Sequence, residues 1–152
     1  MEKIEKIIFA GKRAICREPM AAAILQREHL NFPVEILARG IVVLFPEPLN
    51  PKAEAVLTSN GYPQPSHIAM QLEQEDINND VLILTMEDKQ KSLIWETYEN
   101  APHVYTVKEY VGESGDIPSL HGQPLTVYSQ CYTELELVMR KLVTRLNEEE
   151  EL

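Results

Sequence analysis

The sequence has few cysteines, few glycines and no long hydrophobic run, and each shortage excludes a class of protein. Two cysteines among 152 residues provide neither a disulfide framework nor, alone, a four-cysteine zinc site. No stretch approaches the roughly 20 apolar residues of a membrane span, and the acid-containing N-terminus is unlike a signal peptide. We therefore expect no metal site, no cofactor, no membrane partner and a reduced, cytoplasmic location.

Basic residues are scarce as well. The chain has 14 Lys and Arg against 24 Asp and Glu, which gives a formal net charge of −10. Proteins that bind nucleic acids hold the phosphate backbone chiefly with Lys and Arg, so this balance disfavours a nucleic-acid partner. Part of the acidity lies in the run Glu148 to Glu151, for which we expect a solvated helix end or a frayed terminus.

What the sequence does contain is an alternation of strand-like and helix-like segments. Runs typical of strands occupy residues 7–10, 33–37, 81–86 and 104–107, and helical patterns begin near Pro19, Asn50 and Met86 and cover 125–146. The apolar run 41–45 precedes a proline-marked loop. Because this order is typical of a parallel sheet with helices on both faces, we predict one α/β domain spanning residues 1–152.

The segment after the first strand is a candidate anion site. In such sheets ligands lie beyond the carboxyl ends of the strands, where the N-terminus of a helix offers unpaired N–H groups. The predicted anion-binding loop consists of Gly11, Lys12, Arg13, Ala14, Ile15, Cys16 and Arg17. The alternative is a solvated basic loop without a ligand.

The same segment resembles the active-site opening of the low-molecular-weight protein tyrosine phosphatases. Cys16, Arg17, Pro19 and Met20 match the second cysteine, arginine, proline and methionine of that family's motif. The resemblance continues at 50–53, at His67, at 81–88 and at 115–118, and it ends in the C-terminal helix. It implies the family's fold, with the loop as its phosphate-binding P-loop, and the family's activity, hydrolysis of phosphotyrosine monoesters.

The chain departs from the family where the chemistry resides. The family's nucleophilic cysteine matches Gly11, and the serine after the arginine matches Glu18. The aspartic acid that protonates the leaving group matches Ser119, whose hydroxyl is too weak an acid for that role. The aromatic residue that follows matches His121, which we expect at the rim. We therefore assign no catalytic residue.

Three side chains leave alternatives open. Cys16 is either a packed thiol or, since cations and a helix N-terminus lower a thiol's pKa, a substitute nucleophile. Glu18 either folds onto Arg17 and occludes the pocket as an internal anion, or lies in solvent in the first helical turn. Asp116 is interpreted as a loop-capping residue.

These observations predict a catalytically inactive relative, a pseudophosphatase that acts by binding an inorganic anion, a phosphorylated protein or another partner. Phosphate binding is expected to be weak. The alternatives are a residual or atypical protein-tyrosine or phosphomonoester phosphatase, and an interaction module whose pocket Glu18 closes. The sequence does not indicate an oligomeric state.

Overall fold

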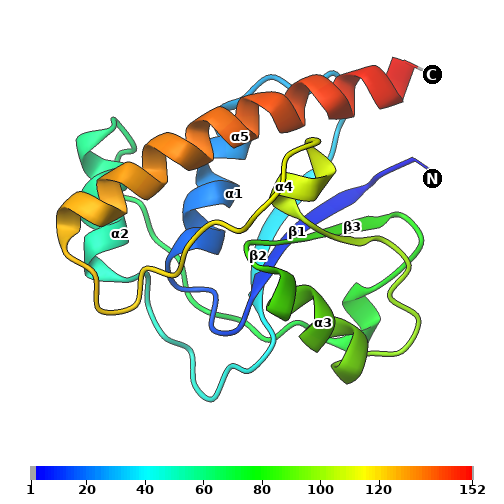
Figure 1. Cartoon of the computed structure of the whole chain (residues 1–152), viewed down its shortest axis with the longest axis horizontal. Helices are drawn as coiled ribbons and strands as arrows, with labels where there is room; N and C mark the ends of the chain where they lie inside the picture. Colours follow the sequence, from blue (N-terminus) through cyan, green and yellow to red (C-terminus); the bar gives the residue numbers. More distant parts are fainter. Residues whose placement is uncertain (1–2, 152) are drawn as a thin grey trace.

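A four-stranded parallel sheet forms the centre of the computed structural model, which describes residues 3–151 (Figure 1). The strand order is β2-β1-β3-β4. The strands are β1 (Lys6–Gly11), β2 (Glu35–Gly40), β3 (Val81–Thr85) and β4 (Val104–Thr106). The helices are α1 (Arg17–Arg27), α2 (Pro51–Ser59), α3 (Asp88–Thr97), α4 (Val107–Tyr110) and α5 (Leu125–Glu151), with a short 3₁₀ turn, η1 (Gln74–Asp76).

Helices cover both faces of this sheet, as predicted. Because side chains alternate along a strand, Ile7 and Phe9 of β1 pack in one core with α1, α2 and α5. Ile8 and Ala10 point the other way, into a second core with Ile94 of α3. Figure 1 shows α5 running across α1 and α2, while α3 lies apart from them on the opposite side. None of the helices within the described range is long and apolar enough to cross a bilayer.

Local sequence signals account for where the helices begin. Asn50 caps α2, since its side chain accepts a hydrogen bond from the Lys52 N–H at 2.9 Å, and Pro51 takes the first helical position. The acidic run ends α5, where Glu149 accepts a hydrogen bond from the Tyr110 hydroxyl at 3.0 Å. The run therefore continues the helix and helps to hold α4 against it.

The apolar run 41–45 is not a strand. β2 ends at Gly40, and the chain then turns onto the loop after β1: Ile41 N–H donates to Gly11 O at 2.8 Å, and Val42 N–H to Lys12 O at 2.9 Å. Ile41 is buried, whereas Leu44 is 87% exposed and Phe45 is 61% exposed. Leu44 and Phe45 therefore form part of the surface beside the loop after β1 and do not belong to the hydrophobic core.

The strand order places a crevice at one end of the sheet. β1 lies between β2 and β3. The chain leaves the carboxyl end of β1 toward β2, whereas it leaves the carboxyl end of β3 toward β4, in the opposite direction. Gly11 ends β1, and Glu87 follows β3 by two residues. The loop after β1 and the start of α3 therefore meet at this point.

Candidate functional site

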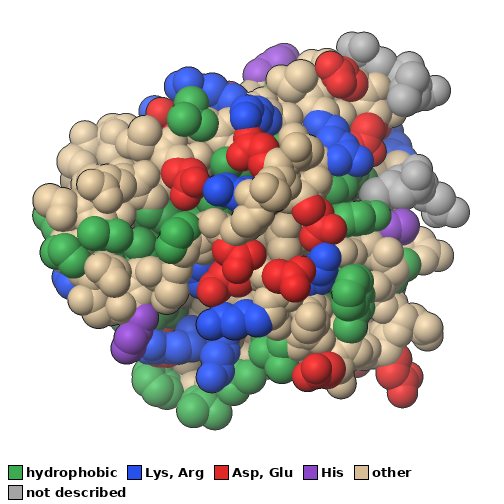
Figure 2. Space-filling view, viewed as in Figure 1, with side chains coloured by type: hydrophobic (Ala, Val, Ile, Leu, Met, Phe, Trp, Pro, Cys, Tyr) green, Lys and Arg blue, Asp and Glu red, His purple; other side chains and the backbone are tan. Residues whose placement is uncertain are grey.

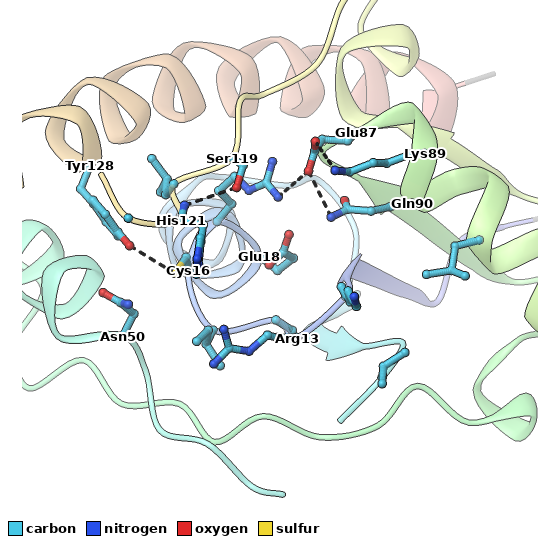
Figure 3. A pocket seen from close by; sticks show the side chains of 18 of the residues that line it. Arg13, Cys16, Glu18, Asn50, Glu87, Lys89, Gln90, Ser119, His121 and Tyr128 are labelled. Carbon is cyan, nitrogen blue, oxygen red and sulfur yellow. Dashed lines mark hydrogen bonds and ion pairs between the residues drawn. The ribbon is translucent and has the colours of Figure 1, made fainter. Parts of the chain in front are cut away.

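A cavity of about 730 Å³ opens at the carboxyl ends of β1 and β3 (Figure 3). It is lined by Lys12 to Glu18, by the start of α3, by residues 119–122 and by Tyr128 of α5. The structure thus brings together nearly all the predicted site residues, including Ser119 and His121. Gly11 is buried at the end of β1, behind this lining.

The loop of residues 11–17, called the first loop from here on, turns its carbonyl groups outward. The carbonyls of Gly11, Lys12 and Ile15 accept hydrogen bonds from Ile41, Val42 and Asn50 N–H. In contrast, no backbone N–H from Lys12 to Cys16 donates to a group within residues 3–151. A row of N–H groups without a backbone partner at the start of a helix is suited to an anion.

Two contacts hold the first loop in this shape. Ala14 has a left-handed backbone with φ of 58°, which reverses the chain. Its carbonyl lies 2.7 Å from Nε2 of His67, and burial lowers the pKa of this histidine, so the neutral ring donates to the carbonyl. Arg13 is also engaged, because its guanidinium forms a two-bond ion pair with Glu47. His67 and Glu47 therefore support the loop from outside.

Arg17 is buried, and two of its guanidinium nitrogens have partners within the chain. One guanidinium nitrogen donates to Ile117 O at 2.5 Å, and another to Glu87 Oε2 at 2.8 Å. Gln90 and Lys89 also approach the Glu87 carboxylate, at 3.3 Å and 3.5 Å. The partner of Arg17 is thus Glu87, which follows β3, and not Glu18.

Glu18 fills the place where a side chain at position 11 would stand. A Cβ built on Gly11 would lie 2.9 Å from Glu18 Oε1, and closer still to Oε2 and Cδ. Real Cβ atoms do not approach other atoms so closely. Figure 3 shows the Glu18 carboxyl near the centre of the first loop, among the residues that line the cavity. The structure therefore places the Glu18 carboxyl group in the space that a side chain at position 11 would need.

This carboxyl group is buried, and a nearby positive charge compensates its burial only in part. Glu18 is 4% exposed, and its Oε2 has no hydrogen-bond partner among the described residues. Burial raises the pKa of Glu18, because the charged form loses its hydration, and the nearby positive charge of Arg17 offsets only part of that rise. Glu18 therefore keeps its proton to a higher pH than a solvated glutamate does.

Cys16 faces away from the loop centre. Its Sγ lies 3.7 Å from the Tyr128 hydroxyl of α5, as Figure 3 shows. Burial raises the pKa of the Cys16 thiol, and the Tyr128 hydrogen bond and nearby arginines offset this only in part. The second cysteine, Cys131, is buried in α5, where burial raises its pKa to about 12. Neither thiol is activated.

The loop after α4 supplies no acidic group to the cavity. Ser119 Oγ accepts a hydrogen bond from the His121 N–H at 3.3 Å, and both residues line the cavity. Asp116 accepts from the Asp88 N–H at 3.0 Å and so caps α3, in agreement with its interpretation as a capping residue. Within residues 3–151, no group of three or more His, Cys, Asp or Glu side chains is arranged to hold a metal ion.

Sequence reasoning missed four contributors to the site. Glu87, Gln90 and Tyr128 line the cavity, and Glu47 holds Arg13 from behind. Glu87 lay in a segment that matched the family's pattern, which was the only available signal. The other three come together only through folding.

A parallel α/β sheet with a cavity at its switch point, a helix N-terminus and a buried arginine defines a class of phosphate-handling α/β domains. Residues 6–152 match the family described as low molecular weight phosphotyrosine protein phosphatase. The chain belongs to this family.

Similar proteins agree with this assignment. The chain is 30% identical over 139 residues to the low molecular weight protein-tyrosine-phosphatase PtpB of Staphylococcus haemolyticus, covering 91% of this chain and 98% of that protein. It is 31% identical over 147 residues to a protein-arginine-phosphatase of Geobacillus stearothermophilus, covering 95% and 98%.

Solved structures show the same fold. The YwlE arginine phosphatase from Geobacillus stearothermophilus superposes with a TM-score of 0.88 at 31% identity, covering 96% of this chain and 95% of that one. The low molecular weight protein tyrosine phosphatase from T. tengcongensis gives 0.84 at 30% identity, covering 93% and 99%.

Proposed function

We propose that this member of the phosphatase family acts by binding and not by phosphoryl transfer, as a pseudophosphatase. The observation that carries the proposal is the exchange at the centre of the first loop, where Gly11 has no side chain and the Glu18 carboxyl fills the space. Family membership by itself favours phosphatase activity, and the relatives bear phosphatase names. The argument for inactivity therefore rests on the chemistry of the site alone.

Covalent catalysis needs an activated nucleophile aimed at the bound phosphorus and an acid for the leaving group. Cys16 is present in the loop, but its sulfur contacts Tyr128 and its thiol is held protonated. Ser119 stands at the position of the acid, and its hydroxyl does not protonate a leaving group near neutral pH. On this reasoning, no residue of the site can act as the nucleophile and none can act as the general acid.

The groups that would bind an anion are still present in the site. The free N–H groups of the first loop favour an oxyanion, and Lys12 adds a solvent-exposed positive charge. We propose an inorganic anion or the phosphoryl group of a phosphorylated protein as the ligand, in the cytoplasm, where free thiols such as Cys16 persist. Affinity should be weak, because the Glu18 carboxyl already occupies the loop centre.

The test is hydrolysis of para-nitrophenyl phosphate by the wild type and by a variant in which the three lost groups are returned. The variant is Gly11→Cys/Glu18→Ser/Ser119→Asp. Glu18→Ser is required because a side chain at position 11 collides with the Glu18 carboxyl. We expect no turnover above background from the wild type or from Gly11→Cys alone, and measurable turnover from the triple variant.

Cys16→Ser is the matched control, because it removes the remaining thiol of the loop. Wild-type turnover that Cys16→Ser abolishes would overturn the proposal and establish an atypical phosphatase with Cys16 as its nucleophile. A folded triple variant without turnover would also count against it, since the scaffold would then not be a phosphatase site from which only the reacting groups are missing.

A further inference from the structure

Two buried side-chain oxygen atoms of the cavity have no hydrogen-bond partner within residues 3–151. They are Glu18 Oε2 and Gln90 Oε1, and both residues line the same cavity. Buried polar atoms are nearly always paired, because an unpaired one loses its hydration without compensation. Both atoms accept hydrogen bonds, so the protein itself supplies no donor at these two points. A proton on Glu18 turns one of these acceptors into a donor.

The two arginines near Glu18 are already paired with carboxylates, so the protonation state of Glu18 is the main variable charge of the site. Arg17 is neutralised by Glu87, which also attracts Lys89, and Arg13 is neutralised by Glu47. The remaining titratable or charged groups that line or adjoin the cavity are Lys12 and Cys16 of the first loop, Glu96 of α3, His121 of the rim, and Tyr128 and Cys131 of α5. An ionised Glu18 would place a further negative charge among the loop's free N–H groups.

We propose that the first loop is a proton-coupled oxyanion site, in which a tetrahedral dianion such as sulfate or a phosphate monoester binds together with one proton on Glu18. This inference rests on the proposed binding function and deepens it. When ionised, Glu18 is itself the anion of the loop and repels the ligand. When protonated, it is neutral, and its O–H can donate to a ligand oxygen while the loop N–H groups donate to the others.

The proton balance is simple, because no covalent bond changes other than the O–H bond on Glu18. Above the pKa of Glu18 in the empty site, each bound dianion takes up one proton from solvent. The same N–H groups would repel a cationic ligand, so the polarity of the loop selects an oxyanion. The rise in the pKa of Glu18 on burial brings the coupling toward physiological pH.

The experiment is calorimetric titration of the intact chain with sulfate, which keeps its charge between about pH 5.5 and about pH 8, unlike phosphate. In the wild type we expect the affinity to fall by roughly tenfold per pH unit above the pKa of Glu18. Titrations at one pH in two buffers with different ionisation enthalpies should give an uptake of about one proton per sulfate. Glu18→Gln keeps the size of the side chain and should bind sulfate with little pH dependence and no such uptake.

Two further variants make the result decisive. Glu18→Ser leaves the loop centre open and should bind sulfate more tightly than the wild type at about pH 7.5, even if Glu18→Gln folds poorly. Because a histidine also gains a proton in this range, His121→Gln should keep most of the wild-type pH dependence.

The possible failures are distinguishable. Sulfate binding with the same pH dependence in the wild type and in Glu18→Gln would overturn the proton coupling and leave the binding function standing. No sulfate binding to the wild type or to either Glu18 variant at any pH would overturn both.

Discussion

The packing of Gly11 against Glu18 makes a quantitative prediction for Gly11→Ala. The backbone of Gly11 is not left-handed, so it does not require glycine. The available space does require glycine, because the new methyl group would lie 2.9 Å from Glu18 Oε1 and closer to two other atoms of the carboxyl group. The substitution must therefore displace Glu18 from the loop centre.

Two effects set the size of the change in the free energy of unfolding. Overpacking a buried site costs about 1–3 kcal/mol. Replacing glycine by alanine restricts the unfolded chain and returns about 0.4–1 kcal/mol. We expect a net loss of about 1–2 kcal/mol in the wild type. In a Glu18→Ala background the collision is absent, and the same change should stabilise the chain by about 0.5 kcal/mol.

The assay is a double-mutant cycle by urea denaturation at neutral pH, followed by circular dichroism. The expected coupling between the two sites is about 2 kcal/mol, whereas independent sites add to within about 0.5 kcal/mol. Gly40→Ala is the matched control, because its methyl group would meet Val43 and, at 3.0 Å, the carbonyl oxygen of Arg13. Its cost should not depend on Glu18. Additivity between Gly11→Ala and Glu18→Ala would refute the placement of the carboxyl group.

Two other predictions concern charges in the site. Because the pKa of Glu18 is raised in the fold, the folded chain keeps this proton to higher pH than the unfolded chain. The contribution of this proton to the free energy of unfolding is therefore complete below about pH 4.5. It is lost as the pH rises toward the pKa of Glu18 in the folded chain. Glu18→Gln should remove this loss, and a wild-type-minus-variant difference that stays constant in urea titrations from about pH 4 to about pH 8 would contradict the assignment. Glu87→Ala leaves Arg17 buried without its carboxylate and should lower the free energy of unfolding by about 3 kcal/mol or more. The control Arg140→Ala breaks an exposed pair with Glu136 and should lower it by less than about 0.5 kcal/mol. Equal losses for the two variants in thermal or urea unfolding would show that the buried pair does not stabilise the fold.

The fold could be predicted from the sequence because its signals are local. Apolar runs of strand length alternate with capped helices, and Asn50 and Pro51 mark the start of α2 as they do in the structure. The run 41–45 shows the limit of such patterns. Its residues are as apolar as those of a strand, yet β2 ends at Gly40 and the segment leaves the sheet to cover the first loop.

The site was predictable in its location but not in its pairing. The resemblance to the family's motif was enough to mark Gly11 and Glu18 as departures on either side of the matching Arg17, next to or within one loop. Glu87, the partner of Arg17, lies 70 residues away along the chain, and no spacing indicates it. That Glu18 fills the space of a missing side chain at position 11 depends on the curvature of the loop, which only the folded chain shows.

The surface around the first loop also has a mixed character. Figure 2 shows basic and hydrophobic side chains next to each other at the lower edge of the molecule, where the first loop and residues 41–48 lie in Figure 1. Val42, Leu44 and Phe45 are among the exposed large hydrophobic residues. An anion held in the first loop would therefore have apolar neighbours.

The mutual exclusion of a side chain at position 11 and the Glu18 carboxyl has an evolutionary consequence. A cysteine placed at position 11 alone meets the carboxyl group, and a serine placed at position 18 alone leaves position 11 without a side chain. Under the proposed function, neither single change would return a catalyst, so selection for catalysis would favour neither one alone. The two positions are therefore epistatic, because the effect of a side chain at position 11 depends on the residue at position 18.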